Sequence, residues 1–307
     1  MRSSITARFV AVRNVVFVPI ALVGSLSDGV VAPIDLAPAI LPPEVLYPDS
    51  RTRAPNCVVL RSEDIGDDGV VDNRTRITYE SSGRIQEEAL DSNADGIFEA
   101  QAYYFYDENG NLIQIQVVGA EIDRYIYDAA GRLIITSRWK GGRVVWRDTL
   151  HYDREGRLVK VVQDFNGDGV GDRITTWTAG DLEWVGVATS NPGGRAAATE
   201  RRILHEGRVV LEEFDVLSNG SVDSSHGYRY DAMGRLLEVL TGQAQPTGVA
   251  YRYEYRDDLV VTMIANPDST SADVTYFYYD DSDRLTEAFS VDHVERPRRA
   301  RYDYSCE

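Results

Sequence analysis

The sequence is short of several residue types and patterns, and each shortage excludes a class of protein. Lysine occurs only at Lys140 and Lys160, and 49 acidic against 32 basic residues give a formal net charge of −17. A surface this acidic repels phosphate backbones, so we expect no nucleic-acid partner. No window after the N-terminus has a long helical period or the roughly 20 apolar residues that a membrane-spanning helix needs. We therefore expect an all-β chain with no transmembrane segment in its mature part.

Sequence motifs for catalysis are missing as well. The chain has no Gly-x-Ser-x-Gly elbow, no His-Glu-x-x-His helix and no phosphate-binding glycine loop. Aspartate and glutamate are so abundant that the sequence does not exclude a catalytic pair of carboxylates. Nearly every acidic cluster, however, is explained by turns or by calcium-type loops. We expect a protein that is not an enzyme, with a glycoside hydrolase as the alternative.

The N-terminus predicts export. Three arginines precede an apolar stretch over residues 15–23, and small residues then offer a cleavage site, so residues 1–25 are predicted to be a signal peptide. The rival interpretation is a membrane anchor, but the stretch is short and Pro19 interrupts it. Residues 26–55 hold six of the eleven prolines and are predicted to form a tether. The folded domain then covers residues 56–307, and we expect it outside the cell or at its surface, with the periplasm also open.

The chain has two cysteines, Cys57 and Cys306, near the two ends of the predicted domain. An even number of cysteines in an exported protein favours a disulfide. Such a bond would clasp the first and last units of the domain. The alternative is a pair of free thiols.

A repeat of about 25 residues dominates the sequence. Its core is Tyr-Asp-x-x-Gly-Arg-Leu, in which Asp and Gly suit a tight turn between two strands. Tyrosines recur at alternate positions before the turn, which places them on one face of a strand. The result is predicted to be tandem antiparallel β-hairpins forming a curved or coiled sheet. The four clearest copies begin at Tyr106, Tyr127, Tyr152 and Tyr230, and degenerate copies begin at Tyr79, His205 and Tyr279.

These motifs resemble the YD or RHS repeats of bacterial surface proteins and toxin shells, over approximately residues 79–285. The resemblance implies a ribbon of β-hairpins, which in that family coils into a shell or tube. Because some YD proteins bind sugars, the resemblance also implies sugar binding, with less force than it implies the fold. The family's toxin shells are far longer and end in an Asp-rich self-cleaving segment, which this sequence does not have. We therefore carry over neither encapsulation nor toxin delivery.

Two acidic loops follow repeat motifs at a fixed distance and match a calcium-loop pattern. Carboxylate and amide oxygens at loop positions 1, 3 and 5, a carbonyl at 7 and an acid at 9 can surround Ca²⁺ with weak, extracellular-type affinity. The alternative is a pair of solvated turns whose acids bind only their own backbone. Two further loops, 64–72 and 215–223, look decayed because Gly66 and Leu217 occupy position 3. The predicted ligands are Asp91, Asn93, Asp95, Ile97 and Glu99 in the first loop, and Asp164, Asn166, Asp168, Val170 and Asp172 in the second.

The tyrosine stripes are interpreted as structural, because their position follows the turn of each repeat. The four tryptophans fall in the least regular repeats and form the candidate ligand surface: Trp139, Trp146, Trp177 and Trp184. We expect a secreted or cell-surface scaffold, stabilised by calcium, that presents a surface to glycans or proteins. The first alternative is a purely structural envelope or matrix component, and the second is a polysaccharide-active hydrolase.

Overall fold

The computed structural model describes residues 55–179, 183–190, 196–206, 208–270, 272–292 and 296–306, and these form twenty β-strands. Within these ranges, no helix is long and apolar enough to cross a membrane. The predicted signal peptide and all of the predicted tether except Pro55 lie outside the described residues. The strands are β1 (Cys57–Ile65), β2 (Asn73–Tyr79), β3 (Ile85–Asp91), β4 (Ala100–Tyr106), β5 (Leu112–Val117), β6 (Ile122–Tyr127), β7 (Leu133–Lys140), β8 (Arg143–Tyr152), β9 (Leu158–Asp164), β10 (Arg173–Ala179), β11 (Glu183–Ser190), β12 (Ala196–His205), β13 (Arg208–Asp215), β14 (Ser224–Tyr230), β15 (Leu236–Gly242), β16 (Gly248–Arg256), β17 (Leu259–Ala265), β18 (Asp273–Tyr279), β19 (Leu285–Val291) and β20 (Pro297–Cys306).

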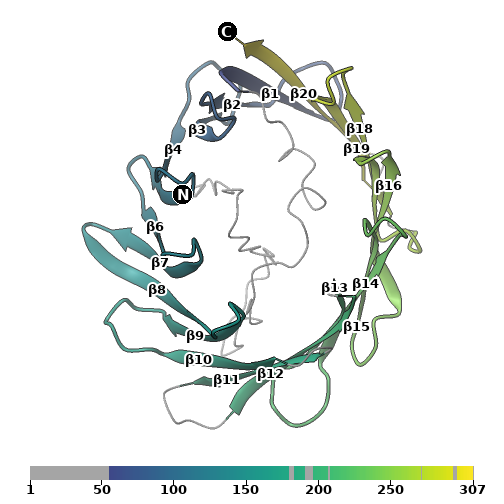
Figure 1. The fold of residues 1–307 in the computed structure, drawn as a ribbon. Coiled ribbons are helices and arrows are strands. Elements are labelled where there is room, and N and C mark those ends of the chain that lie inside the picture. The colour runs from purple at the N-terminus through teal and green to yellow at the C-terminus, as the bar shows by residue number, and fades with distance from the viewer. Residues whose placement is uncertain are drawn as a thin grey trace, which may run out of the picture.

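The strands close into a single barrel, with each strand antiparallel to the next and β20 paired with β1 (Figure 1). The prediction of a curved or coiled sheet is therefore wrong, although the all-β class is confirmed. The closing seam runs from the Cys57–Cys306 pair to the Ile65–Arg298 pair. An open sheet would leave the N–H and C=O groups of both edge strands unpaired, and closure removes these edges.

The two faces of the sheet differ sharply in burial. Tyr104 is 6% exposed whereas its neighbour Phe105 is 43% exposed, and Phe277 and Tyr278 differ in the same way, at 7% and 50%. Strand residues alternate between faces, so the repeated tyrosines share one face, here called the Tyr face. Most of the largest fully buried apolar side chains lie on it, Val59, Leu236, Val260 and Leu285.

The Tyr-Asp-x-x-Gly motif forms the turn of each hairpin. In the β4–β5 turn, the Asp107 N–H donates to the Asn111 carbonyl at 2.9 Å and the Gly110 N–H donates to the Asp107 carbonyl at 3.0 Å. Gly110 has a φ of +87°, a backbone conformation that is unfavourable for residues with a side chain. The carboxylate of Asp107 also accepts from the N–H groups of Asn109 and Asn111. The motif thus encodes its turn through contacts within five residues.

The last tyrosine of each motif also joins neighbouring hairpins. Its hydroxyl donates to the carbonyl of the first or second strand residue after the preceding turn, as in Tyr255 to Leu236 at 2.8 Å. This contact links the end of one hairpin to the next, so the repeat encodes the sheet as well as the turn. The other donor–acceptor pairs are Tyr106–Ile85, Tyr127–Leu112, Tyr152–Leu133, Tyr230–Val209, Tyr279–Val260 and Tyr304–Leu285, all at 2.8–3.0 Å.

A disulfide joins Cys57 to Cys306, as predicted. The two residues are paired at the end of β1 and β20, next to the pair of Val59 with Tyr304. Tyr304 makes the hydroxyl contact of a motif tyrosine, so β20 and β1 form the last hairpin-like unit. In this unit a covalent bond stands where the other hairpins have a turn.

Candidate functional site

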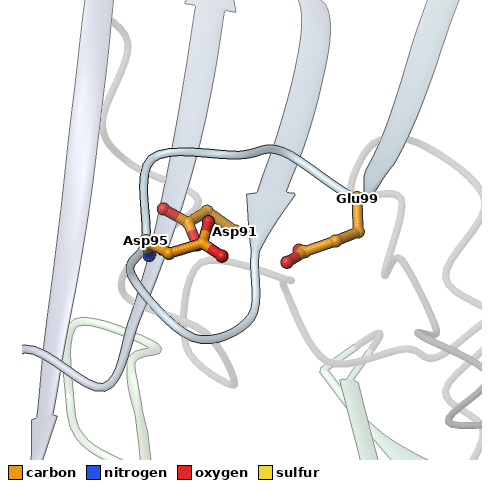
Figure 2. A group of neighbouring side chains, drawn as sticks. All are labelled: Asp91, Asp95 and Glu99. Atoms are coloured by element: carbon orange, nitrogen blue, oxygen red, sulfur yellow. The ribbon is translucent and has the colours of Figure 1, made fainter.

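The first acidic loop connects β3 to β4 and brings three of its predicted ligands together. Carboxylate oxygens of Asp91, Asp95 and Glu99 all lie within 4.8 Å of one another, and Figure 2 shows Glu99 extending toward the two aspartates. Asp91 is fully buried at the end of β3, whereas Asp95 and Glu99 are exposed. Oxygens at this spacing can share one Ca²⁺, whose oxygen ligands lie at about 2.3–2.6 Å.

The same side chains also satisfy the backbone of the loop. Asp91 accepts from the N–H groups of Asp95 at 3.1 Å and Gly96 at 2.9 Å. Asp95 accepts from the Ile97 N–H at 2.8 Å, and Glu99 accepts from the Ser92 N–H at 2.9 Å. The predicted ligand Asn93 donates from its amide to the second carboxylate oxygen of Asp95 at 2.9 Å. Turn formation alone therefore accounts for each acidic position.

The second complete loop, between β9 and β10, has a similar backbone pattern, except that its first aspartate accepts from position 4 and not from position 5. Asp164 accepts from the N–H groups of Gly167 and Gly169, at 2.6 and 2.9 Å. The Asp168 carboxylate accepts from the Val170 N–H, and Asp172 accepts from the Phe165 N–H. In the described part of the chain, three acids meet at metal-binding distances in the first loop and not in this one.

The two loops predicted to be decayed fold in the same way. The Asp64 carboxylate accepts from the Gly69 N–H at 2.8 Å, and the Asp215 carboxylate accepts from the Gly220 N–H at 2.7 Å. Asn219 stands where Asp95 stands in the first loop, and its oxygen accepts from the Ser221 N–H at 2.8 Å. These loops keep the fold with no side-chain oxygen at position 3, so a full set of cation ligands is not what shapes the turn.

The tryptophans predicted to form a ligand surface are divided between the two faces of the sheet. Trp139 pairs with Ile122 on the face opposite the tyrosines, where its indole N–H donates to Ser137 and Arg124 covers its ring at 4.7 Å. Trp146 lies on the Tyr face and is half-buried. The backbone of Trp184 pairs with Ala179 in β10, and its side chain lies outside what the structure describes.

Trp177 belongs to the core. It is 5% exposed and packs with Val161, Ala188 and Ala198. Its indole lies against Gly186, where a Cβ would come within 2.5 Å of the ring nitrogen. The tryptophans therefore do not form one continuous surface in the described part of the chain.

A buried charge network interrupts the tyrosine pattern on β12 to β14. The Arg202 Nε lies 2.5 Å from Glu200 and 3.0 Å from Glu212, and all three side chains are nearly buried. The Tyr228 hydroxyl donates to Glu212, and burial, followed by the Glu212 charge, raises the pKa of Tyr228. Motif analysis did not identify these residues. The available signal was the pair of opposite charges at alternate positions, Glu200 and Arg202, just before a degenerate copy of the repeat.

Asp148 is a second buried group that motif analysis missed. It is 2% exposed on β8, and burial raises its pKa to about 7, partly opposed by a hydrogen bond from Gln163. Gln163 is its directly paired neighbour on β9. One oxygen of each side chain, Asp148 Oδ1 and Gln163 Oε1, is buried without a hydrogen-bond partner.

Comparison with known proteins gives distant structural likenesses. No protein-family model matches the chain, and no curated protein matches it. A crystal structure of TcdB2-TccC3-Cdc42 is similar over 72% of this chain, at 10% identity and a TM-score of 0.41, and this chain spans 12% of the length of that one. A porin-like protein from Bacteroides uniformis ATCC 8492 is similar over 83% of this chain and 97% of its own, at 12% identity and a TM-score of 0.35. The YD or RHS resemblance therefore stays a prediction from the motif.

Proposed function

We propose that this chain is an exported, non-enzymatic β-barrel that acts as a rigid binding scaffold at the cell surface. The observation that carries the proposal is the Cys57–Cys306 disulfide at the barrel seam. Disulfides persist in oxidising compartments outside the cytoplasm. The position of the bond, at the end of the last hairpin-like unit, supports a structural role in holding the barrel closed.

Charges on both faces of the sheet support a barrel surrounded by water. A barrel embedded in lipid needs an outward apolar band about 25 Å tall. Here the more exposed face carries ion pairs within its strands, including Arg76–Glu87 at 3.0 Å and Arg252–Glu238 at 2.9 Å. The Tyr face has the Arg202 network and also Arg138, 2.8 Å from Asp123. Over the residues that the structure describes, neither face is therefore a continuous apolar band.

Calcium stiffening of the first acidic loop is part of the proposal. Asp91, Asp95 and Glu99 offer three carboxylate oxygens at spacings that suit one Ca²⁺, and Asn93 is a nearby amide. The donor set fits a hard divalent cation. A bound ion would neutralise part of the charge that gathers at this end of the sheet. The second loop is the weaker candidate because its three acids are not gathered.

The proposed partners are glycans or proteins outside the cytoplasm, and the experiment is to probe arrays of both with the purified full chain. Reproducible binding to one class, retained after mild heating and lost after unfolding, is the expected result. Flat profiles on both arrays would favour the alternative, a structural component of the envelope or matrix. Release of sugars from a polysaccharide panel would instead favour a hydrolase.

A further inference from the structure

The motif arginine occupies a recurring slot between two hairpins, as Arg132 shows. Arg132 lies 2.7 Å from the Asp128 carboxylate of its own turn, and its guanidinium sits 4.9 Å from the centre of the Tyr152 ring in the next hairpin. It also fills the space beneath the next turn, where a Cβ on Gly156 would lie 3.5 Å from its Nη1. An acid, an aromatic ring and a glycine thus enclose one guanidinium.

The slot recurs around the barrel. In five described copies an arginine covers the motif tyrosine of the following hairpin, and in three of them a glycine in the following turn leaves room for it. A Cβ on Gly110 would clash with Arg84, and one on Gly234 would clash with Arg208. The other arginine–tyrosine pairs are Arg84–Tyr106 at 4.6 Å, Arg208–Tyr230 at 5.9 Å, Arg235–Tyr255 at 4.8 Å and Arg284–Tyr304 at 4.9 Å.

The slot between the β4–β5 and β6–β7 hairpins has no arginine, because Asn111 stands in its place. The Asn111 amide donates to Asp107 at 2.9 Å, which replaces the first contact of the arginine. Among the described residues no cation lies over the Tyr127 ring. A Cβ added at Gly131 would meet no atom within 4 Å. Acid, ring and glycine are all present, and the guanidinium is missing.

A cavity of about 590 Å³ occupies this place, lined by Asp107, Asn111, Tyr127 and Gly131 among others. One hairpin earlier, where Arg84 covers Tyr106, the cavity in the corresponding region measures about 280 Å³. The comparison within one molecule indicates that the arginine side chain accounts for much of the difference. The larger cavity therefore has the chemistry of a vacant guanidinium site.

We propose that this slot, here called the Asp107–Tyr127 slot, binds the guanidinium group of an arginine side chain of a partner protein. The planar cation would stack on the Tyr127 ring and donate to Asp107 and to the Asn111 amide oxygen. The proposal rests on the proposed function, a barrel that presents its hairpin ends to partners. It adds the chemistry that one such end recognises.

The charge state of the slot supports the proposal. Among the residues that the structure describes, Asp107 has no ion-pair partner, unlike the corresponding Asp128, which is paired with Arg132. Hydrogen bonds from the Asn111 side chain and from backbone N–H groups lower the pKa of Asp107, so its carboxylate is ionised at neutral pH. The net charge of −17 also draws cations toward the barrel.

The test is a titration of the full chain, labelled with ¹³C in its tyrosine rings, followed by NMR. The probe is N-acetyl-arginine methylamide, and the matched control is the citrulline derivative, which has the same shape and no charge. The Tyr127 signals, assigned with Tyr127→Phe, are expected to shift saturably with the arginine probe and not with the citrulline one. No saturable shift at Tyr127, or equal shifts with both probes, would overturn the proposal.

Two variants sharpen the test. Asn111→Arg restores the repeat, so it should fill the slot, abolish the Tyr127 shift and raise the melting temperature. Arg132→Asn empties a filled slot that has the same acid, ring and glycine, Asp128, Tyr152 and Gly156, and should transfer a similar response to Tyr152. An unchanged Tyr127 shift in Asn111→Arg would count against the slot. If the chain binds a partner on the arrays but Tyr127 does not respond, the slot is rejected and the proposed function stands. If Tyr127 responds but the arrays are flat, only the proposed function is rejected.

Discussion

At the scale of single residues, the protonation state of Asp148 decides whether Asp148 and Gln163 can satisfy each other's hydrogen bonds. Both are buried, they lie directly opposite each other, and each has one oxygen without a hydrogen-bond partner. A proton on Asp148 Oδ1 could donate to Gln163 Oε1, which would satisfy both oxygens. An ionised Asp148 would leave both oxygens buried without a donor, at a cost of about 1–3 kcal/mol for each group.

The barrel should therefore lose stability as Asp148 ionises. Its pKa is raised from 3.8 to about 7 in the folded chain, so the contribution is complete below pH 4, falls as the pH rises to about 7, and is then constant. The free energy of unfolding of Asp148→Asn, relative to that of the parent chain, should rise by about 1.4 kcal/mol per pH unit across this window as an upper bound. Denaturant unfolding of both chains from pH 4 to 8 measures it. A constant difference would show that Asp148 ionisation does not control stability.

At the scale of single elements, each hairpin and each acidic loop repeats one set of backbone contacts. The residue before the loop accepts from the N–H of position 9 in all four acidic loops, at 2.7–2.9 Å. Gly66 and Leu217 are tolerated at position 3, so these contacts do not depend on a full ligand set. Selection for turn formation and selection for calcium binding therefore leave nearly the same sequence pattern.

Asp95→Asn separates these two roles in the first loop. The change keeps an oxygen that can accept from the Ile97 N–H, as Asn219 does for Ser221 in loop 215–223. It removes one of the three gathered negative charges. Millimolar Ca²⁺ should raise the melting temperature of the parent chain above its value in chelator, and Asp95→Asn should lose most of that rise. The control is Asp168→Asn in the second loop, which should keep it. Equal melting of the parent chain in calcium and in chelator would eliminate the site.

At the scale of the whole molecule, the barrel depends on one seam that joins residues distant in sequence. Cys57 and Cys306 are 249 residues apart, and strand pairing continues from them along the full length of β1. Every other neighbouring pair of strands is also consecutive in the chain. The seam is thus the one junction that must be closed over the entire length of the domain.

Removing the disulfide should loosen this seam first. The double variant Cys57→Ser/Cys306→Ser is expected to lose at most about 5 kcal/mol of stability, the chain-entropy value for so long a loop. Hydrogen exchange should accelerate in β1 and β20 before it changes in β5 and β6, which serve as the internal reference. Uniform acceleration across all strands would mean that the bond stabilises the barrel as a unit. Unchanged exchange at the seam would mean that the strand pairs hold it closed unaided.

The sequence by itself determined the all-β class, the hairpin unit and its turn, because Asp107 and Gly110 act on atoms within five residues of themselves. It also predicted the Cys57–Cys306 pair, from cysteine number and predicted export. Closure was decided by the tertiary structure, because twist and register add up over all twenty strands before β20 meets β1. The division of Trp139 from Trp177, the gathering of Asp91 with Glu99, and the contact of a motif arginine with the next tyrosine, as in Arg235 with Tyr255, also depend on how neighbouring units pack. A local motif does not determine the distance between neighbouring hairpins, so these features can be seen only in the closed barrel.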